Sequence, residues 1–518
     1  MIKMIPLPEP NTASALWSAA GIALLLIVCG YVGFLVKSKT TTFENYLVGE
    51  RNIGPIITGA AVAAGYLSGW AALGMMGVTY TVGWSGMWFA GIWTIFGIVP
   101  CVLFVARKFS YFSKRFNAQT VADVLGIRFN SKTVQITAGI VMIVLMFIYS
   151  IGQLKAAAAC WYAITGFSPF ICLLLSIIVV IVYMVIGGYT GTQWAMGIQG
   201  FLIGAACLAL GIWALYLVGG MDGLSKLLTA QDTNLMALIR PDLPQVGNTQ
   251  LFSSMVGITS TFFLFFTMAT GFPHVTARFL GMRELNKKDY VKLMLTVFLI
   301  AGIPIFLNAV SGLSARAVWG DRLLHIAPWK ADLAAPFLAM SGGLPLTSLY
   351  ITGLFSAALS SLAAMILGIA GSVTRDVIQI IKPNASPRAL LLLTRILIVV
   401  VIFIPFYWTL VAPPPLLAAW MAQAAIGMGG IFIWVIAGSL YWKRATATGA
   451  IICMIYGIIA VLIGSVLVSK NTLGMGTLMY IVLIGCGICY IVGSLLTSPP
   501  PREKVTEFFT LSKDNSAA

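Results

Sequence analysis

The chain has 518 residues, of which 59% are hydrophobic and only 9% are charged. A water-soluble domain carries charge on about a quarter of its residues, so this composition excludes a soluble globule and predicts a membrane protein. The formal net charge is +16, which by itself would suit a nucleic-acid-binding protein, so the positions of the positive residues must decide between the two.

Apolar runs long enough to cross a bilayer recur along the whole chain. A hydrocarbon core about 30 Å thick needs about 20 apolar residues per helix. Thirteen such runs are found, at 16–36, 55–80, 83–107, 134–160, 168–187, 193–218, 250–270, 291–316, 345–373, 389–411, 415–441, 447–468 and 476–497. The sequence therefore predicts an all-α membrane protein with about 13 transmembrane helices.

The first run follows Lys3 and so resembles a secretory signal peptide. At 21 residues, 16–36 is longer than the apolar region of such a peptide. We therefore expect it to be kept as the first span.

The positive residues sort by side of the membrane. If the N-terminus lies outside, 22 of the 31 Lys and Arg residues fall in inner segments. These are Lys37, Lys39, Arg51, Arg107, Lys108, Lys114, Arg115, Arg128, Lys132, Arg278, Arg283, Lys287, Lys288, Lys292, Arg375, Lys382, Arg388, Lys443, Arg444, Arg502, Lys504 and Lys513. The positive-inside rule then predicts that the N-terminus lies outside and the C-terminus inside, and we expect the membrane to be the bacterial inner membrane. The basic surplus indicates contact with anionic lipid and no nucleic-acid partner.

The order of the spans predicts an internal repeat within a single membrane transport domain, 1–518. Spans 2–6 (55–218) and spans 7–11 (250–441) are two consecutive groups of five. Because five is odd, the second group starts from the opposite side of the membrane, which makes the repeats inverted. An extra N-terminal helix (16–36), two extra C-terminal helices (447–497) and a cytoplasmic tail (498–518) flank them.

Each group opens with a span rich in small or hydroxylated residues, at 59–65 and at 259–271. Paired interrupted helices in corresponding places indicate a transport site at mid-bilayer. The alternative is that the small residues only permit close helix packing.

The acidic residues favour a metal cation over a proton as the coupling ion. None of the 15 Asp and Glu residues falls inside a predicted span, and His274 and His325 fall in predicted loops. Proton-driven carriers usually hold a titratable group within the membrane. A hard cation such as Na⁺ needs only oxygen ligands, which backbone carbonyls at a helix break and hydroxyl groups supply.

Two segments contain such oxygens. Span 9 contains the adjacent Ser360 and Ser361, one turn after Ala357, and span 2 contains the sequence from Ala64 to Trp70, where glycine and serine favour a break. Paired serines in a membrane helix also commonly bond back to their own helix and bend it, and the residues alone leave this alternative open.

The chain resembles the sodium:solute symporter family over about residues 43–450. The matching segments, in order, are Tyr46-Leu-Val-Gly-Glu-Arg51, Ala64 to Trp70, Arg115-Phe-Asn-Ala-Gln-Thr-Val-Ala-Asp123, Gly187-Gly-Tyr-Thr-Gly-Thr-Gln-Trp194, Gly271-Phe-Pro-His-Val-Thr-Ala-Arg278, Ser356 to Asp376 and Tyr441-Trp-Lys-Arg444. Within the family, the chain looks most like the sodium/pantothenate and monocarboxylate branch. The resemblance implies a leucine-transporter-type five-plus-five inverted repeat with flanking helices.

The resemblance also implies a Na⁺ site. It would consist of the backbone carbonyls of Ala64, Leu67 and Ala357 with the hydroxyls of Ser360 and Ser361. Five uncharged oxygens would then surround one cation.

Two departures from the family pattern bear on ion coupling and on the solute. Where the family often has Trp-Thr-Asp, this chain has Trp194-Ala-Met196, so a thioether replaces a carboxylate. Proline-type members carry Asp where this chain has Tyr66, which argues against a proline-like solute.

Solute recognition is predicted from polar and aromatic residues along the expected cavity. Lys155 would bind a solute carboxylate together with the positive helix end at Ser68, or would extend to the outer headgroups. The other candidates are Tyr66, Trp70, Gln153, Thr259 and Thr261. The sequence Gly271-Phe-Pro-His274 breaks the helix at the end of span 7, either as a gate or as a simple exit turn.

These observations predict a secondary active transporter that couples inward Na⁺ flow to uptake of a small organic solute, a monocarboxylate or a pantothenate-like anion, by alternating access. A proton-coupled or cation-independent carrier on the same fold and a membrane sensor are the alternatives. We expect no enzymatic activity, because no catalytic triad, metal cluster or carboxylate pair lies in the spans. Cys486-Gly-Ile-Cys489 is interpreted as helix packing, and no obligate protein partner is implied.

Overall fold

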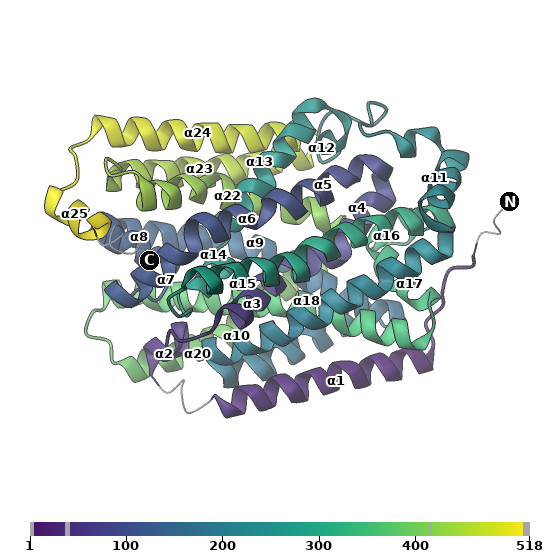
Figure 1. The fold of residues 1–518 in the computed structure, drawn as a ribbon, viewed down its shortest axis with the longest axis horizontal. Helices are drawn as coiled ribbons and strands as arrows, with labels where there is room; N and C mark the ends of the chain where they lie inside the picture. The colour runs from purple at the N-terminus through teal and green to yellow at the C-terminus, as the bar shows by residue number, and fades with distance from the viewer. Residues whose placement is uncertain (1–4, 37–41, 415, 511–518) are drawn as a thin grey trace.

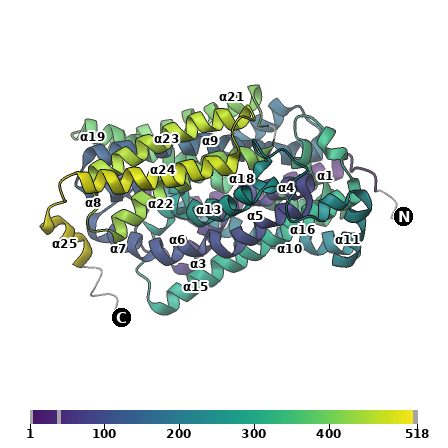
Figure 2. The same ribbon diagram turned by 90° about the horizontal axis from the view of Figure 1, so that it is seen from above.

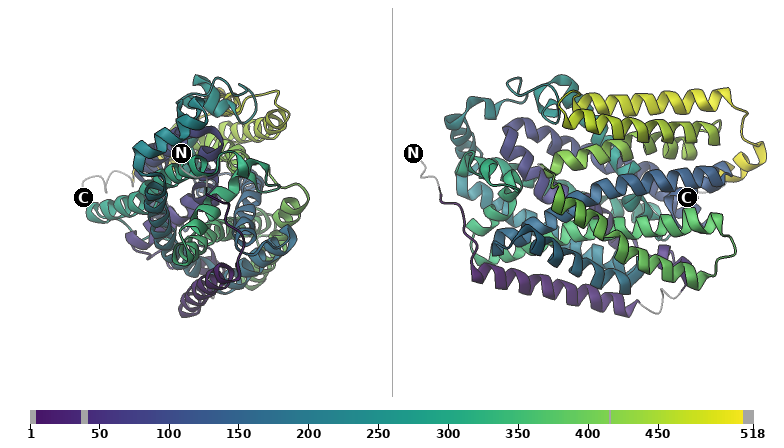
Figure 3. Two further views of the ribbon diagram at one scale, coloured as in Figure 1. Left: turned by 90° about the vertical axis from the view of Figure 1, so that its right-hand side faces the viewer. Right: turned by 180° about the vertical axis from the view of Figure 1, so that it is seen from behind.

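The computed structural model describes residues 5–36, 42–414 and 416–510. These residues form a bundle of helices that run mostly along one long axis (Figure 1). No strand is found in these three ranges, apart from two isolated β-bridges. Viewed from the end that carries the N-terminus, most helices point toward the viewer (Figure 3).

The helices of the first half begin with α1 and end with α11. They are α1 (Thr12–Leu35), α2 (Phe43–Val48), α3 (Pro55–Gly69), α4 (Met75–Val82), α5 (Met87–Ile92), α6 (Val99–Cys101), α7 (Arg107–Phe116), α8 (Val121–Phe129), α9 (Lys132–Thr165), α10 (Pro169–Val218) and α11 (Gly220–Gln231). Short wider or tighter helical segments, such as η2 (Trp70–Gly74), join several of them.

The second half follows after an irregular segment. Its helices are α12 (Gln250–Ser253), α13 (Met255–Gly271), α14 (Pro273–Thr276), α15 (Lys287–Val297), α16 (Ile303–Trp319), α17 (Ala334–Ser341), α18 (Leu344–Gly371), α19 (Gln379–Ile381), α20 (Pro387–Val401), α21 (Phe403–Val411), α22 (Leu417–Tyr441), α23 (Ala447–Ser469), α24 (Met475–Leu496) and α25 (Arg502–Thr510).

The helices are compatible with the predicted number of about 13 crossings. Ten helical runs are individually long and apolar enough to cross a membrane. One of them, Pro55–Phe116, has 62 residues, or about 93 Å of helix, which is about three times the hydrocarbon core. It crosses twice, turning at Gly83, whose φ of +73° only glycine adopts easily.

Two further crossings complete the set. The bent pair Met255–Gly271 and Pro273–Phe279 forms one, and the shorter apolar segment Pro169–Ile181 at the start of α10 forms the other. Ten runs and the bent pair make eleven candidate spans, and counting Pro169–Ile181 and a second crossing within Pro55–Phe116 gives the expected thirteen.

The helix α10 reverses direction near its middle. The first end of α10 lies near Pro10, which is adjacent to Gly166, and Trp213 near its other end donates a hydrogen bond to Ser341 (3.1 Å). Tyr189 in the middle instead donates to the carbonyl of Arg278 at the opposite end of the bundle (3.0 Å). The two halves of α10 are therefore the two predicted spans 5 and 6.

Burial separates central from peripheral spans. In the 18-residue apolar stretch of the run that begins with α18, 94% of the residues are buried, whereas in that of α1 28% are buried. The α1 helix lies along one edge of the bundle, and α23 and α24 lie side by side along the opposite edge (Figures 1 and 2). The first apolar run is thus a span that packs against α10 and α18.

The short tail helix α25 lies at the end of the bundle opposite the N-terminus (Figure 1). Its Phe508 stacks on Phe112 of α7 at a centroid distance of 4.0 Å. Part of the predicted cytoplasmic tail is therefore folded against the bundle.

No acidic residue lies within the predicted span bounds, but two lie just beyond them in helices that are longer than the predicted spans. Asp376 and Asp289 lie inside the helical runs Leu344–Ile381 and Lys287–Trp319, and both are buried. The helices extend further than the apolar runs, and Asp376 Oδ1 accepts hydrogen bonds there from Thr120 and Gln135 (2.6 and 2.9 Å).

Candidate functional site

The first span of the first group is broken at Ser68. This residue has φ 48° and ψ 178°, which interrupts α3 one residue before its end and just before η2 begins. The break frees backbone donors, and side chains accept from them: Gln153 Oε1 from the Gly69 N–H (2.8 Å), and Ser68 Oγ from the Trp70 N–H (3.1 Å). Irregular backbone at membrane depth requires such partners. Gly69 is needed here, because a side chain would collide with Ala156.

The second group opens with a break at Phe272, between α13 and α14, which are bent by 47°. Its ψ of 106° leaves the helical region, and the following Pro273 has no N–H to continue the helix. Gly271 permits close contact here, since a Cβ would overlap the Met428 carbonyl of α22. The predicted pair of interrupted helices is present, and Gly271-Phe-Pro-His274 forms the 47° bend between α13 and α14.

The two serines of span 9 lie against the break of span 2. Ser360 Oγ donates to the carbonyls of Ala357 (2.9 Å) and Ala64 (3.4 Å). Ser361 Oγ donates to the carbonyl of Gly65 (3.1 Å). Both serines are fully buried, and α18 continues as a helix through them. Ser361 bonds to a different helix, so the alternative of simple back-bonding does not account for the pair.

The structure thus brings together Ala64, Ala357, Ser360 and Ser361, and adds the carbonyl of Gly65. Leu67 lies one turn beyond Ala64, and its carbonyl accepts the Trp70 N–H. It is therefore at the break, but bonded within its own chain segment.

The oxygen separations suit a cation of the size of Na⁺. Ca²⁺, an ion of similar radius, holds oxygens at about 2.3–2.6 Å, so two ligands at a right angle lie about 3.4 Å apart. The Ser360 pairs at 2.9 and 3.4 Å and the Ser361 pair at 3.1 Å lie at this value or a few tenths of an ångström below it. Because a hydroxyl rotates freely, each Oγ can present a lone pair to an ion instead of donating.

The surroundings of these oxygens are apolar. Met196, Ala61, Ala64 and Ala364 form one small buried cluster, and the Met196 methyl group lies next to Gly65. No group of three or more His, Cys, Asp and Glu residues that could hold a metal is found in the described part of the chain. The candidate ligands are therefore neutral oxygens.

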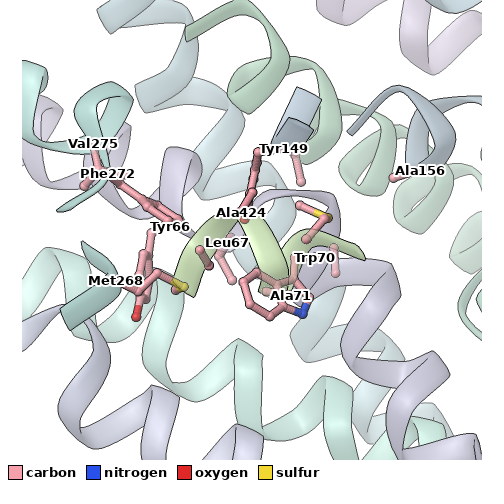
Figure 4. Packing of buried hydrophobic residues seen from close by; sticks show 14 of the residues in the cluster. Tyr66, Leu67, Trp70, Ala71, Tyr149, Ala156, Met268, Phe272, Val275 and Ala424 are labelled. Atoms are coloured by element: carbon pink, nitrogen blue, oxygen red, sulfur yellow. The ribbon is translucent and has the colours of Figure 1, made fainter. Parts of the chain in front are cut away.

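Aromatic rings surround the other side of the break (Figure 4). Trp70 packs on Trp93 (centroids 5.1 Å apart), on Tyr149 (6.1 Å) and on Phe265 (5.8 Å). Tyr66 meets Trp93 edge to face at 5.5 Å. Of these rings, sequence reasoning missed Trp93, Tyr149 and Phe265; the position of Tyr149, one turn before Gln153, was the available signal.

Several polar side chains in this wall lack partners. Trp70 Nε1 and Gln153 Nε2 are buried donors that find no acceptor in the described residues. A buried unpaired donor costs about 1–3 kcal/mol, so these groups favour a ligand that offers oxygen atoms.

The two threonines predicted to line the cavity, Thr259 and Thr261, point in different directions. Thr261 is buried, but its hydroxyl bonds back to the Gly257 carbonyl (3.0 Å). Thr259 is exposed and accepts a hydrogen bond from Tyr480 of α24 (2.8 Å). The prediction for Thr259 is wrong, because residues two apart on a helix point in different directions.

The headgroup contact predicted for Lys155 is wrong, and the side chain has partners within the protein. Its ammonium group is buried and forms an ion pair with Asp332 (2.6 Å), and it also donates to the Pro414 carbonyl (2.7 Å). The segment that carries Asp332 folds back into the bundle, which the sequence did not reveal. Burial raises the pKa of the Asp332 carboxyl, and the Lys155 ammonium opposes this rise.

A cavity lies on the side of the break opposite Lys155. Its empty volume is about 500 Å³, including the part open to solvent. The lining includes His274, Arg278, Ala364, Gly368 and Ser372. His274, predicted to lie in a loop, is buried in α14 beside Phe272. The cavity therefore leads from the breaks toward the end that carries the basic inner segments.

Comparison with known proteins identifies a matching family and similar proteins. The family model described as the sodium:solute symporter family matches residues 46–457. The high-affinity proline transporter PutP of Bacillus subtilis is 24% identical over 491 residues, which cover 92% of this chain and 98% of that protein. The osmoregulated proline transporter OpuE of the same organism is 24% identical over 506 residues, covering 95% and 96%.

A solved structure shows the same overall fold. It is a Na⁺-coupled sialic acid symporter in a substrate-bound outward-open state, with a TM-score of 0.71, 20% identity, and coverage of 94% of this chain and 99% of the other. The leucine-transporter-type fold implied by the sequence is thereby confirmed. The relatives named above are proline transporters, so they do not support the assignment to the pantothenate and monocarboxylate branch.

Proposed function

Because the chain belongs to the sodium:solute symporter family, with Na⁺ as the coupling ion, we propose that Na⁺ binds between the break of α3 and the serines of α18. The ligands are the carbonyls of Ala64, Leu67 and Ala357 and the hydroxyls of Ser360 and Ser361. The observation that supports this site is that both hydroxyls reach carbonyls at the break, at 3.1 and 3.4 Å.

The ion links two elements that must move together. Without it, only weak hydroxyl-to-carbonyl contacts join α3 to Ser360 and Ser361. A bound cation would draw the carbonyls and hydroxyls toward one point and so stabilise one arrangement of α3 against α18. Ligand binding of this kind shifts the population between outward-facing and inward-facing states.

The membrane supplies the driving force. The repeats are 55–218 and 250–441, and the N-terminus lies outside the bacterial inner membrane, with the basic segments inside. A membrane potential adds about 2.3 kcal/mol per charge for every 100 mV to inward Na⁺ movement. Uptake of the solute is therefore driven inward.

The transported solute is a small organic molecule with a carboxylate, such as a monocarboxylate or a pantothenate-like anion. The unpaired donors Trp70 Nε1 and Gln153 Nε2 support this class, since both need an acceptor. Trp70, Tyr66 and Phe265 offer apolar faces for the rest of the molecule. Tyr66, at the position where proline-type members carry Asp, argues against proline itself.

Uptake into proteoliposomes tests the function. Labelled pantothenate, short monocarboxylates and proline are compared with an inward Na⁺ gradient, with K⁺ in its place, and with a pH gradient alone. We expect Na⁺-driven uptake of a carboxylate other than proline. Equal rates in Na⁺ and K⁺ would contradict Na⁺ coupling, uptake driven by pH alone would support a proton-coupled carrier, and uptake of proline only would contradict the proposed solute class.

A further inference from the structure

A buried ion pair lies just beyond the break, on the side away from the cavity. Lys155 Nζ is 2.6 Å from Asp332 Oδ2, and each side chain is 1% exposed. The same ammonium donates to the Pro414 carbonyl at 2.7 Å. One cation thus joins α9, the segment between α16 and α17, and the loop that precedes α22.

The helix α9 gives the order of these features along the bundle. Met142 and Met146 line the cavity, Tyr149 lies 3.4 Å from the Ser68 hydroxyl, and Gln153 accepts the Gly69 N–H. Lys155 follows, about 13 Å from Met146 at 1.5 Å per residue. The cavity, the break and the ion pair therefore follow one another from one side of the membrane to the other.

The outer half of the broken span also contacts the pair. A Cβ added to Gly77 of α4 would lie 3.1 Å from Asp332 Oδ1. Leu417, at the start of α22, lies against Gly74 of the same broken span. Opening a path from this side to the break requires α4, α9 and the start of α22 to separate, and the Lys155 contacts oppose that separation.

We propose that Lys155, Asp332 and the Pro414 carbonyl form an outer latch, which is closed while the site faces the cavity and is broken when the site faces the other side. This latch is a part of the alternating access proposed above and rests on it. Lys155 does not contact the solute in this scheme.

The physical basis is the difference in hydration between the two states. In the closed state both charges are removed from water, and each depends on the other for compensation. When the outer side opens, water reaches both groups, so the pair can separate at little cost. Removing one partner leaves an uncompensated buried charge only in the closed state, and the population moves toward the outward-open state.

A cysteine reporter tests the latch. Leu417 is fully buried behind the pair, so Leu417→Cys reacts with a membrane-impermeant maleimide added outside only when the outer side opens. The eight native cysteines give a background, which is measured in each variant without the reporter and subtracted. Labelling is measured in the full-length chain in proteoliposomes, without solute.

We expect Lys155→Met to increase the labelling rate about tenfold or more. In uptake assays, the same variant should reach half-maximal uptake at a lower Na⁺ concentration, and its maximal uptake rate should also be lower. The double variant Lys155→Met with Asp332→Leu removes both charges and should return labelling toward the parent rate. The matched control is Lys226→Met, because Lys226 and Asp222 are also 2.6 Å apart but are 76% and 80% exposed; it should change nothing.

The outcomes separate the latch from other roles and from the proposed function. If Lys155→Met raises the solute KM while labelling stays at the parent rate, Lys155 binds solute and the latch is wrong. If the single and double variants only lower the melting temperature equally, with unchanged labelling, the pair is purely structural and the latch is wrong. If the parent chain shows no Na⁺-driven uptake, the proposed function fails, whatever the labelling shows.

Discussion

The serine pair of α18 provides the most direct prediction. Ser360 Oγ contacts two carbonyls at 2.9 and 3.4 Å, and Ser361 Oγ contacts one at 3.1 Å. A hydrogen-bonding group that faces a charge contributes about 1.5–3 kcal/mol. Since every 1.4 kcal/mol is a factor of about ten in affinity, Ser360→Ala or Ser361→Ala alone should raise the Na⁺ midpoint at least about tenfold, and the double variant about 100-fold.

The assay needs no knowledge of the solute. Na⁺ that binds only the folded protein raises its melting temperature, and the rise grows with the logarithm of the Na⁺ concentration once that concentration exceeds the dissociation constant. The melting temperature of purified protein is therefore followed against Na⁺ concentration, with K⁺ keeping the ionic strength constant. Ser360→Ala with Ser361→Ala should lose most of the Na⁺-dependent rise.

A matched control lies on the same helix. Ser356 is fully buried one turn before Ser360, and its hydroxyl has no hydrogen-bond partner in the described residues. Ser356→Ala should leave the Na⁺ midpoint within about twofold of the parent, because no bond is lost. A double variant whose midpoint stays within about threefold of the parent, or a Ser356→Ala effect of equal size, would refute the assigned ligands.

Three further predictions concern the two breaks and the ion site. Ser68→Val should abolish Na⁺-driven uptake, because a β-branched residue does not adopt φ 48° without strain of about 1–3 kcal/mol. Ser68→Gly should keep part of the uptake. Equal uptake by both variants would contradict the role of this backbone geometry. Met196→Asp should lower the Na⁺ midpoint in the melting assay and slow turnover, because the carboxylate would lie beside Gly65, near the carbonyl ligands. A raised Na⁺ midpoint would show that Met196 does not adjoin the ion. Gly271→Ala should lower the melting temperature by several degrees, because the added Cβ would overlap the Met428 carbonyl. Gly30→Ala should leave the melting temperature unchanged, because no atom lies within 4 Å of the added Cβ. Similar melting temperatures for the two variants would contradict the close approach of α13 to α22.

The sequence alone determined the number of spans and the location of the first break. Both follow from local causes: about 20 apolar residues are needed to cross a bilayer, and Gly65, Ser68 and Gly69 favour interruption of a helix. The second break followed in the same way from Gly271 and Pro273. Such features depend on neighbours in the chain and can be read without a fold.

The tertiary structure decided which polar groups face each other. Ser361 and Gly65 are 296 positions apart and Lys155 and Asp332 are 177 positions apart, yet both pairs are in contact. Lys155 near a span end resembles a headgroup contact in sequence, and only the segment folded back around Asp332 turns it into a buried pair. Thr259 and Thr261 likewise look equivalent in sequence, but the rotation of α13 places one inward and the other against α24. Contacts between distant segments depend on how helices rotate and pack against each other, and local sequence patterns do not predict this packing.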